Sequence, residues 1–531
     1  MASSRHPDLA GLSGVASGHE SGFSAWFSTD IAVAYLLAAV AVALQMATNG
    51  RYGYFRDELY YLALSHHLDW GYVDLAPMSP LVAWISRTLF GDSLHAIRLL
   101  PALALGSEIL ITGLITRALG GKRFAVLLAC LGVLVAPAIL ANGGRFSMNP
   151  FEPLFWMGAT YFLLLAINHD RPQFLVWVGV LVGLGLENKH STAFFLIALL
   201  VGLAATSQRH LFRSKWLWIA AGIIVLLALP NLIWQYQHGF PTWIDLSNVK
   251  KIHKNVELPP LPFLKSQIMM LQPLNALIWM AGLGFLLFDG EGKRYRVLGV
   301  TYLAFLAIMM ALHGKNYYLA PIYPMLFAAG GVFWQELIAA HSRLRWVTVV
   351  LPRVLVVAGV IAFPLVLPIF PPDKIVPYMH ALGVGMPRTE THMNSTLPQH
   401  FADEFGWPEM VAQVAGVYNA MPAEERAKTA ILAGNYGSAG AIDLFGPRYG
   451  LPQSISAHQN YYYWGFRQYT GESLILLNWR FDDAQRWCTN VEAGPEVGNP
   501  YAMSWEHYTI LICHGLKQPL AEAWPRFKVW D

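Results

Sequence analysis

The sequence is poor in charged residues: Asp, Glu, Lys and Arg together make up 13% of its 531 residues, whereas 55% belong to the hydrophobic set. A typical soluble domain has about 25% charged residues, and the mean hydropathy of +0.40 is correspondingly high. The net charge is only +3, which is too small to indicate nucleic-acid binding. The composition therefore excludes an ordinary soluble domain and predicts a polytopic membrane protein that binds the lipid bilayer and no nucleic acid.

Cysteine is also scarce, with only three in the chain. Cys130 lies in an apolar run and is expected to be a packing residue. Cys488 and Cys513 lie in the more polar C-terminal part and would pair only if that part faces an oxidising compartment. Sequence alone does not give the Cα separation that a disulfide needs, so the pairing stays open at this point.

Two kinds of motif are absent as well. The chain has no GxxxxGK[ST] phosphate-binding loop, which argues against a nucleotide-driven pump, and it has no internal repeat. Residues 1–28 are rich in Ser and Gly and lack the apolar core of a signal peptide. We interpret them as a disordered cytoplasmic leader.

What the sequence does contain is a series of long apolar segments. A membrane-spanning helix needs about 20 mostly apolar residues, and on that criterion we expect about eleven spans. They form a transmembrane domain over residues 29–370. The expected segments are residues 30–46, 95–116, 124–140, 151–167, 174–186, 192–206, 216–234, 264–288, 297–312, 319–338 and 346–370.

The loops between these segments alternate in charge. Every second loop is basic, and since Lys and Arg concentrate in cytoplasmic loops, we place these loops in the cytoplasm. They carry Arg117, Lys122 and Arg123; Arg171; Arg209, Arg213 and Lys215; Lys293, Arg294 and Arg296; and Arg343 and Arg345. The other loops hold nearly all the acidic and aromatic clusters and are expected to face outward. They are residues 49–93, 142–150, 187–191, 235–262 and 313–318.

Residues 371–531 differ in composition and are long enough to form a domain of their own. Short apolar runs predict buried strands, and longer amphipathic runs predict helices. The strands are expected at 429–433, 453–457, 473–478 and 508–513, and the helices at 407–419, 423–428 and 435–446. The pattern predicts a small extracytoplasmic (periplasmic) α/β domain. Its aromatic loop at 460–465 suits either stacking on a sugar or packing on the membrane domain.

The first outer loop, residues 49–93, combines acidic and basic residues with aromatics beside the membrane, a mixture typical of chemistry or ligand capture. Asp57 and Glu58 are adjacent, and on a helix their side chains point about 100° apart, so the two carboxylates do not aim at one atom. A single carboxylate beside a hydroxyl suits general-base catalysis. A capped amphipathic helix with an acidic end is the alternative interpretation.

The pattern of this loop resembles the first-loop signature of the bacterial glycosyltransferases of family 39. These enzymes are related to the protein O-mannosyltransferases and to the aminoarabinose transferases of lipid A, and the resemblance implies their GT-C fold. Residues 187–192, 313–324 and 435–452 are similar to further stretches of the family. The matching first-loop residues are Asp57, Glu58, Tyr60, Tyr61, Gly71, Tyr72, Asp74, Pro77, Pro80, Phe90, Gly91 and Arg98.

The resemblance implies that a sugar passes, with inversion, from a polyprenyl-phosphate donor to an acceptor hydroxyl at the outer face of the bacterial inner membrane. By this similarity Asp57 is the expected general base, and Glu58 is its structural or substrate-orienting neighbour. Glu152 is the expected second outward acid, although family members usually have Asp there, and Asn149 could share its role. Ala76 replaces a basic residue that some relatives place before the first-loop proline. The sugar and the acceptor, whether glycan, lipid or protein, therefore stay undetermined.

The lipid phosphate that leaves must stay anionic, so a Lys or Arg at the outer membrane edge would stabilise it. We expect Lys189 in this role first, Lys315 second and Arg145 third. For each of them, a basic residue that merely anchors the membrane interface is the alternative. The other predicted substrate-binding residues are Asp74, Tyr60, Tyr61, His190, Tyr317 and Tyr318.

No metal ion or other cofactor is expected to be required. The chain has no Asp-x-Asp motif, and the resemblance implies catalysis without an essential metal. If a metal took part, His66, His67 and Asp69 would be the candidates, since His and carboxylates can bind Zn²⁺ or Mn²⁺.

A flippase or permease for lipid-linked sugars is the alternative function. It would share the basic outer loops and a lipid groove, but transport normally needs broken helices or charged groups near the bilayer midplane. Glu108 and Arg353 are the main charged residues within the apolar segments. Sugar flux without bond cleavage would separate this function from transfer.

Overall fold

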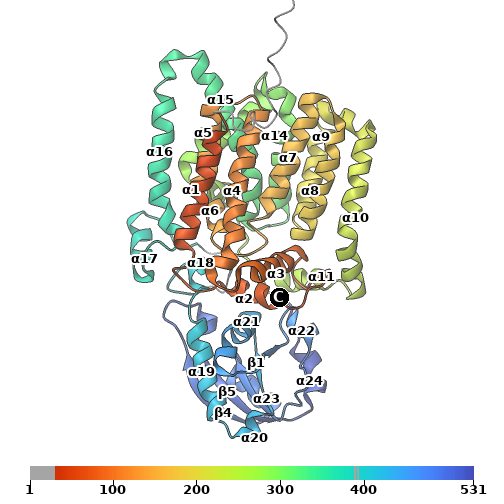
Figure 1. The fold of residues 1–531 in the computed structure, drawn as a ribbon, viewed down its shortest axis with the longest axis vertical. Helices are drawn as coiled ribbons and strands as arrows, with labels where there is room; N and C mark the ends of the chain where they lie inside the picture. The colour runs from red at the N-terminus through yellow and green to blue at the C-terminus, as the bar shows by residue number, and fades with distance from the viewer. Residues whose placement is uncertain (1–29, 388–389, 392–393) are drawn as a thin grey trace, which may run out of the picture.

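The computed structural model describes residues 30–387, 390–391 and 394–531. The leader predicted for residues 1–28 lies outside these residues. The described chain forms an upright bundle of apolar helices with a mixed α/β domain below it (Figure 1). The two parts meet at α2 (Arg56–Leu64) and α3 (Met78–Phe90), which lie across the lower end of the bundle.

Each apolar segment expected to span the membrane is helical in the structure. Within the described part of the chain, five helices are long and apolar enough to cross a membrane, or up to eight if each of three bent pairs is one span. The count of about eleven is not reached by this criterion, because α1, α7 and α8 do not meet it. The bundle helices are α1 (Ala32–Thr48), α4 (Leu94–Ala118), α5 (Arg123–Leu134), α6 (Pro137–Gly143), α7 (Glu152–His169), α8 (Leu175–Asn188), α9 (Thr192–Ala204), α10 (Lys215–Gln237), α12 (Pro260–Met270), α13 (Ala276–Phe288), α14 (Arg296–Ala311), α15 (Tyr323–Ala340) and α16 (Val347–Ala362).

Two of the expected segments are bent rather than straight. The chain turns by 70° between α5 and α6 and by 100° between α12 and the segment that contains α13. Pro137 and Pro273 stand at the starts of the second halves. Proline cannot donate a backbone hydrogen bond to the preceding turn, which accounts for a break at these positions.

The outer helices of the bundle leave large apolar side chains uncovered. Only 17% of the apolar stretch of α10 is buried inside the protein. The value is 28% for the apolar stretch that contains α16. Trp218, Leu226 and Val357 are 66%, 67% and 59% exposed. Apolar surfaces of this extent are stable in contact with lipid rather than with water. The interior of the bundle is aromatic, as where Trp156 stacks on Phe195 with ring centroids 4.6 Å apart.

The C-terminal domain is built on a five-stranded mixed sheet of order β2-β1-β3-β5-β4. β1 (Thr429–Ala433) is parallel to β2 (Ile455–Ser456) and β3 (Ser473–Leu477), whereas β5 (Tyr508–Leu516) is antiparallel to β3 and β4 (Cys488–Val497). Three of the predicted strands are confirmed, and the fourth shrinks to the two residues of β2. The helices of this part are α17 (Pro372–Ala381), α18 (Gln399–Ala402), α19 (Trp407–Ala420), α20 (Ala423–Arg426), α21 (Tyr436–Phe445), α22 (Tyr461–Trp464), α23 (Phe481–Trp487) and α24 (Leu520–Phe527).

The sequence does not predict β4. This strand lies at the edge of the sheet with most of its side chains exposed, so its polar sequence lacks the apolar pattern of a buried strand. Its first residue, Cys488, forms a disulfide with Cys513 of β5. The pairing that the sequence leaves open is therefore made, and Cys130 is a buried free thiol.

The C-terminal domain reaches the first outer loop through α21, which packs on α2. A Cβ atom on Gly440 would lie 2.7 Å from the backbone oxygen of Leu59, and one on Gly437 would lie 2.5 Å from Cγ of Arg56. Larger side chains at these two positions would therefore push the helices apart. The close approach places Tyr436, the first residue of α21, beside Asp57.

Candidate active site at the junction of the two parts

Glu58 is fully buried and lies within the first outer loop. Its carboxylate accepts hydrogen bonds from Arg98 Nε at 2.8 Å and Arg98 Nη2 at 2.6 Å. It also accepts hydrogen bonds from the backbone N–H groups of Phe55 at 2.8 Å and Phe146 at 2.7 Å. The same Arg98 donates to the carbonyl oxygens of Asn49 and Gly53. Glu58 thus ties three stretches of chain together and has no oxygen left over for a substrate.

Asp57 is one residue away and has different surroundings. It is partly buried, and its Oδ1 accepts a hydrogen bond of 2.7 Å from the hydroxyl of Tyr436. Within the described residues, no side chain or backbone group donates to its Oδ2. Burial raises the pKa of Tyr436, with Arg56 opposing and Asp57 reinforcing the shift, so this hydroxyl stays protonated and donates. One oxygen of Asp57 is therefore held in place while the other is free to accept.

Arg56 supports this contact from the other side of Tyr436. Its Nη2 donates to the Tyr436 hydroxyl at 3.0 Å, and its guanidinium carbon lies 4.7 Å from the ring centre. Burial lowers the pKa of Arg56, but Tyr436, Asp403, Asp57 and Glu506 more than offset this effect, so the group stays charged. Arg56 is thus a cation surrounded by the acids Asp57, Asp403 and Glu506.

Two further acids approach Arg56 from the C-terminal domain. Asp403 is 3% exposed, and its Oδ1 has no hydrogen-bond partner among the described residues. Burial, opposed by Arg56 and reinforced by Asp57, raises the pKa of Asp403 to about 8. Burial also raises the pKa of Glu506 to about 7, with Arg56 opposing. At neutral pH Asp403 is therefore mostly protonated.

Tyr60, Tyr61 and Asp74 form the inner wall of the junction. The Tyr60 hydroxyl donates to Asp74 Oδ1 at 3.0 Å, and its ring stacks on that of Tyr436 with centroids 4.6 Å apart. Tyr61 packs edge-on against Phe146 at 5.6 Å. Burial, and next the charge of Asp245, raises the pKa of Asp74 to about 8. Tyr60 and Tyr61 are only 2% and 3% exposed, so both contact protein rather than open space.

Lys189 and Glu152 form a second polar group beside the first. Lys189 Nζ lies 3.0 Å from Glu152 Oε2 and 2.9 Å from Asn149 Oδ1, and it lies 4.6 Å from the ring centre of Tyr318. Ser191 donates to the other oxygen of Glu152. Burial lowers the pKa of Lys189, but Glu152 and the two neighbouring tyrosines raise it by more, so Lys189 is charged.

Tyr317 lies beside the second group. It belongs to the 3-10 turn Asn316–Ile322, next to Tyr318, with ring centroids 5.0 Å apart. Burial raises the pKa of the Tyr317 hydroxyl, the Lys189 charge lowers it and the Asp57 charge raises it. The contacts thus bring together four predicted site residues, namely Glu152, Lys189, Tyr317 and Tyr318.

The remaining predicted residues lie farther around the junction. Arg145 Nε donates to Glu404 Oε1 at 3.1 Å, and Lys315 Nζ lies 4.0 Å from Glu390 Oε1. Each of these two cations thus has an acid from the C-terminal part beside it. His190 lies within hydrogen-bond distance of Asn231 on α10, with 3.2 Å between Nε2 and Oδ1.

The three candidate metal ligands do not converge. His66 contacts Arg87, His67 stacks on Trp464 with centroids 4.2 Å apart, and Asp69 accepts a hydrogen bond of 2.8 Å from Trp234. Across the described ranges, no group of three or more His, Cys, Asp or Glu side chains could hold a metal ion.

The sequence prediction missed the residues that the C-terminal domain brings to the junction. Tyr436 lies within a stretch, residues 435–452, that resembles the family, but nothing in that stretch indicates a contact with Asp57. Asp403 and Glu404 follow α18 and match no motif. Arg56 belongs to the first outer loop instead. Its position next to Asp57 in the sequence was the one available signal that it takes part in the site.

Residues 74–234 match the family model described as dolichyl-phosphate-mannose-protein mannosyltransferase. The match begins at Asp74, so it covers the Lys189 and Glu152 group but not the acidic pair Asp57 and Glu58. The resemblance expected from the sequence is confirmed for this part of the chain.

Two curated proteins are similar over part of their length. The lipopolysaccharide core galacturonosyltransferase RgtB of Rhizobium johnstonii is 25% identical over 190 residues, which cover 33% of this chain and 38% of that protein. The undecaprenyl phosphate-alpha-4-amino-4-deoxy-L-arabinose arabinosyl transferase 1 of Pseudomonas fluorescens is 25% identical over 206 residues, 37% of each chain. The chain thus spans well under half the length of these curated relatives.

Solved structures extend the likeness of fold to nearly the whole chain. ArnT from Cupriavidus metallidurans bound to undecaprenyl phosphate superposes with a TM-score of 0.56 at 14% identity, covering 92% of this chain and 98% of that chain. The apo state of ArnT gives a TM-score of 0.57 at 13% identity with the same coverage. The protein therefore has a polytopic helical membrane fold like that of ArnT, with a C-terminal mixed α/β domain, and the fold prediction is confirmed to this extent.

Proposed function

We propose that the protein is a glycosyltransferase that moves a sugar from a polyprenyl-phosphate donor to an acceptor hydroxyl, with inversion and with Asp57 as the general base. The support is the family match over residues 74–234, the names of the two curated relatives, and the ArnT fold, one structure of which has undecaprenyl phosphate bound. The acceptor is a glycan or lipid, or a protein hydroxyl. No cofactor takes part in the reaction.

One observation carries the proposal: of two adjacent acids, only Asp57 has an uncommitted oxygen. Each oxygen of Glu58 accepts two hydrogen bonds. Within the described chain, Asp57 accepts a hydrogen bond from Tyr436 alone. A general base needs one oxygen fixed for orientation and the other open to the proton it removes. Asp57 Oδ2 would take the proton from the acceptor hydroxyl as the acceptor oxygen attacks the anomeric carbon.

The leaving lipid phosphate keeps its charge, so a cation near the anomeric carbon stabilises the transition state. Of the three candidate cations we favour Lys189, because it is buried, stays charged and lies in the part of the chain that matches the family model. Glu152, Asn149 and the Tyr318 ring hold the ammonium group in position. Arg145 and Lys315, which lie beside Glu404 and Glu390 of the C-terminal part, are the second and third choices.

The reaction is assigned to the outer face of the bacterial inner membrane. Disulfides are rare in the cytosol, so the Cys488–Cys513 bridge supports an extracytoplasmic C-terminal domain. The basic loops that follow the positive-inside rule alternate with the loops that carry Asp57 and Lys189. In this orientation residues 29–370 cross the membrane and residues 371–531 cover the site from outside. All the predicted segments then cross, including α1, α7 and α8.

The test compares the wild type with Asp57→Asn on radiolabelled polyprenyl-phosphate sugars. Loss of a general base lowers the rate about hundredfold to ten-thousandfold. Asp373→Asn is the matched control, because this acid is 53% exposed and its partner Lys374 is also exposed. Turnover of Asp57→Asn equal to that of the control would remove Asp57 from the catalytic role.

A lipid-linked-sugar flippase is the second candidate, and one observation favours it. Glu108 lies inside α4, is 2% exposed, and its Oε1 has no hydrogen-bond partner among the described residues. Buried acids within a membrane span often serve transport. Movement of labelled lipid-linked sugar across sealed vesicles, without cleavage and abolished by Glu108→Gln, would establish this function in place of transfer.

A further inference from the structure

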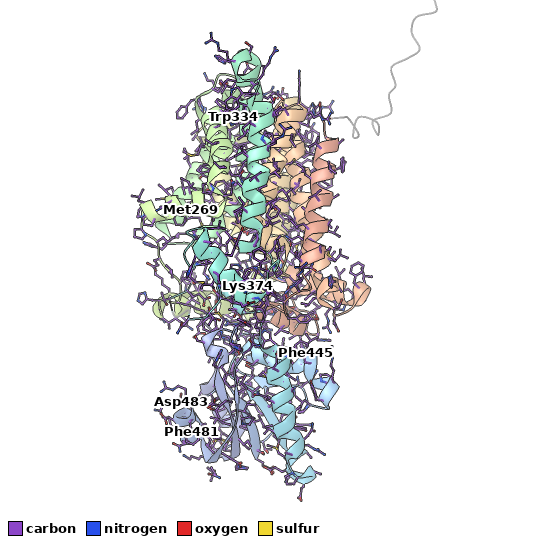
Figure 2. All side chains as sticks on the ribbon, turned by 90° about the vertical axis from the view of Figure 1, so that its left-hand side faces the viewer. Met269, Trp334, Lys374, Phe445, Phe481 and Asp483 are labelled. Atoms are coloured by element: carbon purple, nitrogen blue, oxygen red, sulfur yellow. A yellow bond between two sulfur atoms is a disulfide. The ribbon has the colours of Figure 1, made fainter. Side chains whose placement is uncertain are left out.

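The C-terminal domain contains an open cavity that lies apart from the junction at Asp57. It has a volume of about 390 Å³ and is lined by Arg486, Trp487, Lys517, Gln518 and Arg526. Its walls come from the end of α23, from the segment between β5 and α24, and from α24 itself. Figure 2 shows Asp483 of α23 on the flank of this domain, well away from the helical bundle. The volume is in the range of small-ligand sites, about 300–1,000 Å³.

The cavity is built on fixed parts of the domain. The Cys488–Cys513 disulfide joins the strand that starts beside Trp487 to β5. The backbone N–H of Lys517 donates to the carbonyl oxygen of Trp487 at 2.8 Å, so these two residues stay side by side. The Trp487 ring packs edge-on against Phe527 with centroids 4.8 Å apart. The aromatic wall therefore has a defined position.

Three of the side chains that line the cavity, Arg486, Lys517 and Arg526, are cations, and Gln518 adds an amide. Arg486 pairs with Asp483 at 3.0 Å, but neither Lys517 nor Arg526 has a carboxylate partner in the part of the chain that the structure describes. Lys517 Nζ donates to the carbonyl oxygen of Gln485 at 2.6 Å, which leaves two of its protons available. Nε2 of Gln518 is buried and has no partner among the described residues. A ligand that fits must supply acceptors and negative charge.

The aromatic wall adds a second requirement. The guanidinium carbon of Arg526 lies 5.9 Å from the centre of the Trp487 ring, so a cation and an aromatic surface meet in one cavity. An indole offers a flat apolar surface, against which the C–H face of a pyranose can stack. Inorganic phosphate alone would use the donors and leave this surface uncovered.

We propose that this cavity binds an anionic saccharide, that is, a sugar unit that carries a phosphate or a carboxylate. The anion lies against Lys517 and Arg526 and accepts from Gln518 Nε2, and the sugar ring stacks on Trp487. The site is separate from Asp57 and its occupation does not depend on sugar transfer. Under the proposed function, an acidic acceptor glycan would be its natural ligand.

The experiment measures binding to the full chain in nanodiscs of zwitterionic lipid by isothermal titration calorimetry, without any polyprenyl donor. The probes are glucose 6-phosphate, glucuronate, inorganic phosphate and glucose. We expect at least one of the two acidic sugars to bind about tenfold more tightly than either phosphate or glucose, because only the acidic sugars use both the donors and the ring. The proposal would be overturned if inorganic phosphate bound as tightly as both acidic sugars. It would also be overturned if glucose bound as tightly as both acidic sugars.

Two variants test the residues. Lys517→Gln combined with Arg526→Gln removes both cations and is expected to weaken binding of the acidic sugar at least about tenfold. Gln518→Glu keeps the size of the side chain but replaces the donor with a negative group, and is expected to abolish binding. The matched control is Lys428→Gln combined with Arg480→Gln, two exposed cations of the same domain outside the cavity.

The outcomes separate this site from general attraction by surface charge. Equal losses in the Lys517/Arg526 and Lys428/Arg480 variants would overturn the proposal, as would unchanged binding in Gln518→Glu. Because no donor is present, these results are independent of whether the protein transfers sugar. An inactive transferase with intact binding would reject the proposed function and leave this inference standing.

Discussion

Two regions at the start of α2 differ sharply, although they begin at adjacent acids. In the Glu58 core, a fully buried carboxylate accepts four hydrogen bonds, two of them from Arg98. In the Asp57 junction, a partly buried carboxylate accepts one hydrogen bond, from Tyr436 of the C-terminal domain. All four donors to Glu58 come from the membrane part of the chain, although Arg98 also lies 3.6 Å from Glu404 of the C-terminal part. The Asp57 junction is shared between the two parts.

The comparison shows that the surroundings, and not the residue type, separate structure from chemistry here. An ionised carboxylate offers about four lone-pair sites, and the donors around Glu58 occupy them. Asp57 keeps acceptor capacity, and Arg56 provides the charge that keeps its surroundings from being wholly acidic. Substitutions in the Glu58 core should therefore affect stability, and substitutions in the Asp57 junction should affect turnover.

The largest expected effect is on stability, from Glu58→Gln. This change keeps the shape of the side chain but removes the nearest counterion of Arg98, which is 1% exposed, and leaves only Glu404, 3.6 Å from Arg98 Nη2. Breaking a buried pair by removing one partner costs about 3–5 kcal/mol. We expect a lower apparent unfolding midpoint in detergent, whereas Asp57→Asn should keep the wild-type midpoint.

Glu472→Gln is the control for this prediction. The Glu472–Lys428 pair spans 3.0 Å with both side chains 54% exposed, and exposed pairs of this kind contribute little to stability because water and salt screen them. Equal destabilisation by Glu58→Gln and Glu472→Gln would show that the Glu58 core is not the structural anchor described above. A larger loss of midpoint in Asp57→Asn than in Glu58→Gln would reverse the comparison.

An intermediate effect is expected from Tyr436→Phe, which keeps the ring and removes the one donor to Asp57 found among the residues that the structure describes. The aromatic contacts with Tyr60 at 4.6 Å and His458 at 5.0 Å would remain. Loss of one hydrogen bond to a charged group corresponds to about tenfold in rate. We expect kcat to fall by this factor while KM for the donor stays unchanged, because Tyr436 positions Asp57 without binding the lipid phosphate.

Tyr449→Phe provides the matched control, since Tyr449 is 43% exposed and lies in the same domain. Steady-state kinetics of the two variants would be measured side by side in detergent. Wild-type kcat in Tyr436→Phe would mean that the C-terminal domain covers the junction without positioning the base, and a raised KM with normal kcat would assign Tyr436 to substrate binding instead.

The same two regions show what the sequence could and could not predict. The apolar length of each bundle segment predicts helices such as α4 and α10, because a membrane span is a local property of composition. The 100° bend between α12 and α13 was not predicted, because residues 264–288 were predicted as one apolar segment and the break signal of Gln272 and Pro273 within it was not used. The edge strand β4 was missed because its exposed side chains carry no apolar signal.

At the site, the adjacent acids were predicted from a local motif, but their partners were not. Asp57 and Tyr436 are 379 positions apart, and Glu58 and Arg98 are 40 apart. Each contact depends on how segments that are far apart in the chain pack together. No short stretch of the sequence specifies that packing. Asp403 illustrates the point further: its neighbours are ordinary in sequence, and only burial beside Arg56 gives it unusual properties.

The smallest expected effect tests whether the Asp57 junction contains a neutral acid. The pKa of Asp403 is raised by burial from 3.8 to about 8. Between these two pH values, Asp403 therefore keeps its proton in the folded state and has lost it in the unfolded state. The contribution of Asp403 to stability is greatest below about pH 4 and declines as the pH rises, until the folded group also ionises. Asp403→Asn does not titrate, so its midpoint should rise relative to the wild type between pH 5 and pH 8.5.

The measurement is the difference in apparent unfolding midpoint between Asp403→Asn and the wild type across that pH range, and we expect it to grow by about 2 °C. Taking the difference cancels the titration of Glu506 and other shared groups to first order. Asp482→Asn, at an exposed acid of α23, is the control and should show a constant difference. A constant difference for Asp403→Asn as well would mean that Asp403 is ionised at neutral pH. Arg56 would then face a second full negative charge beside that of Asp57.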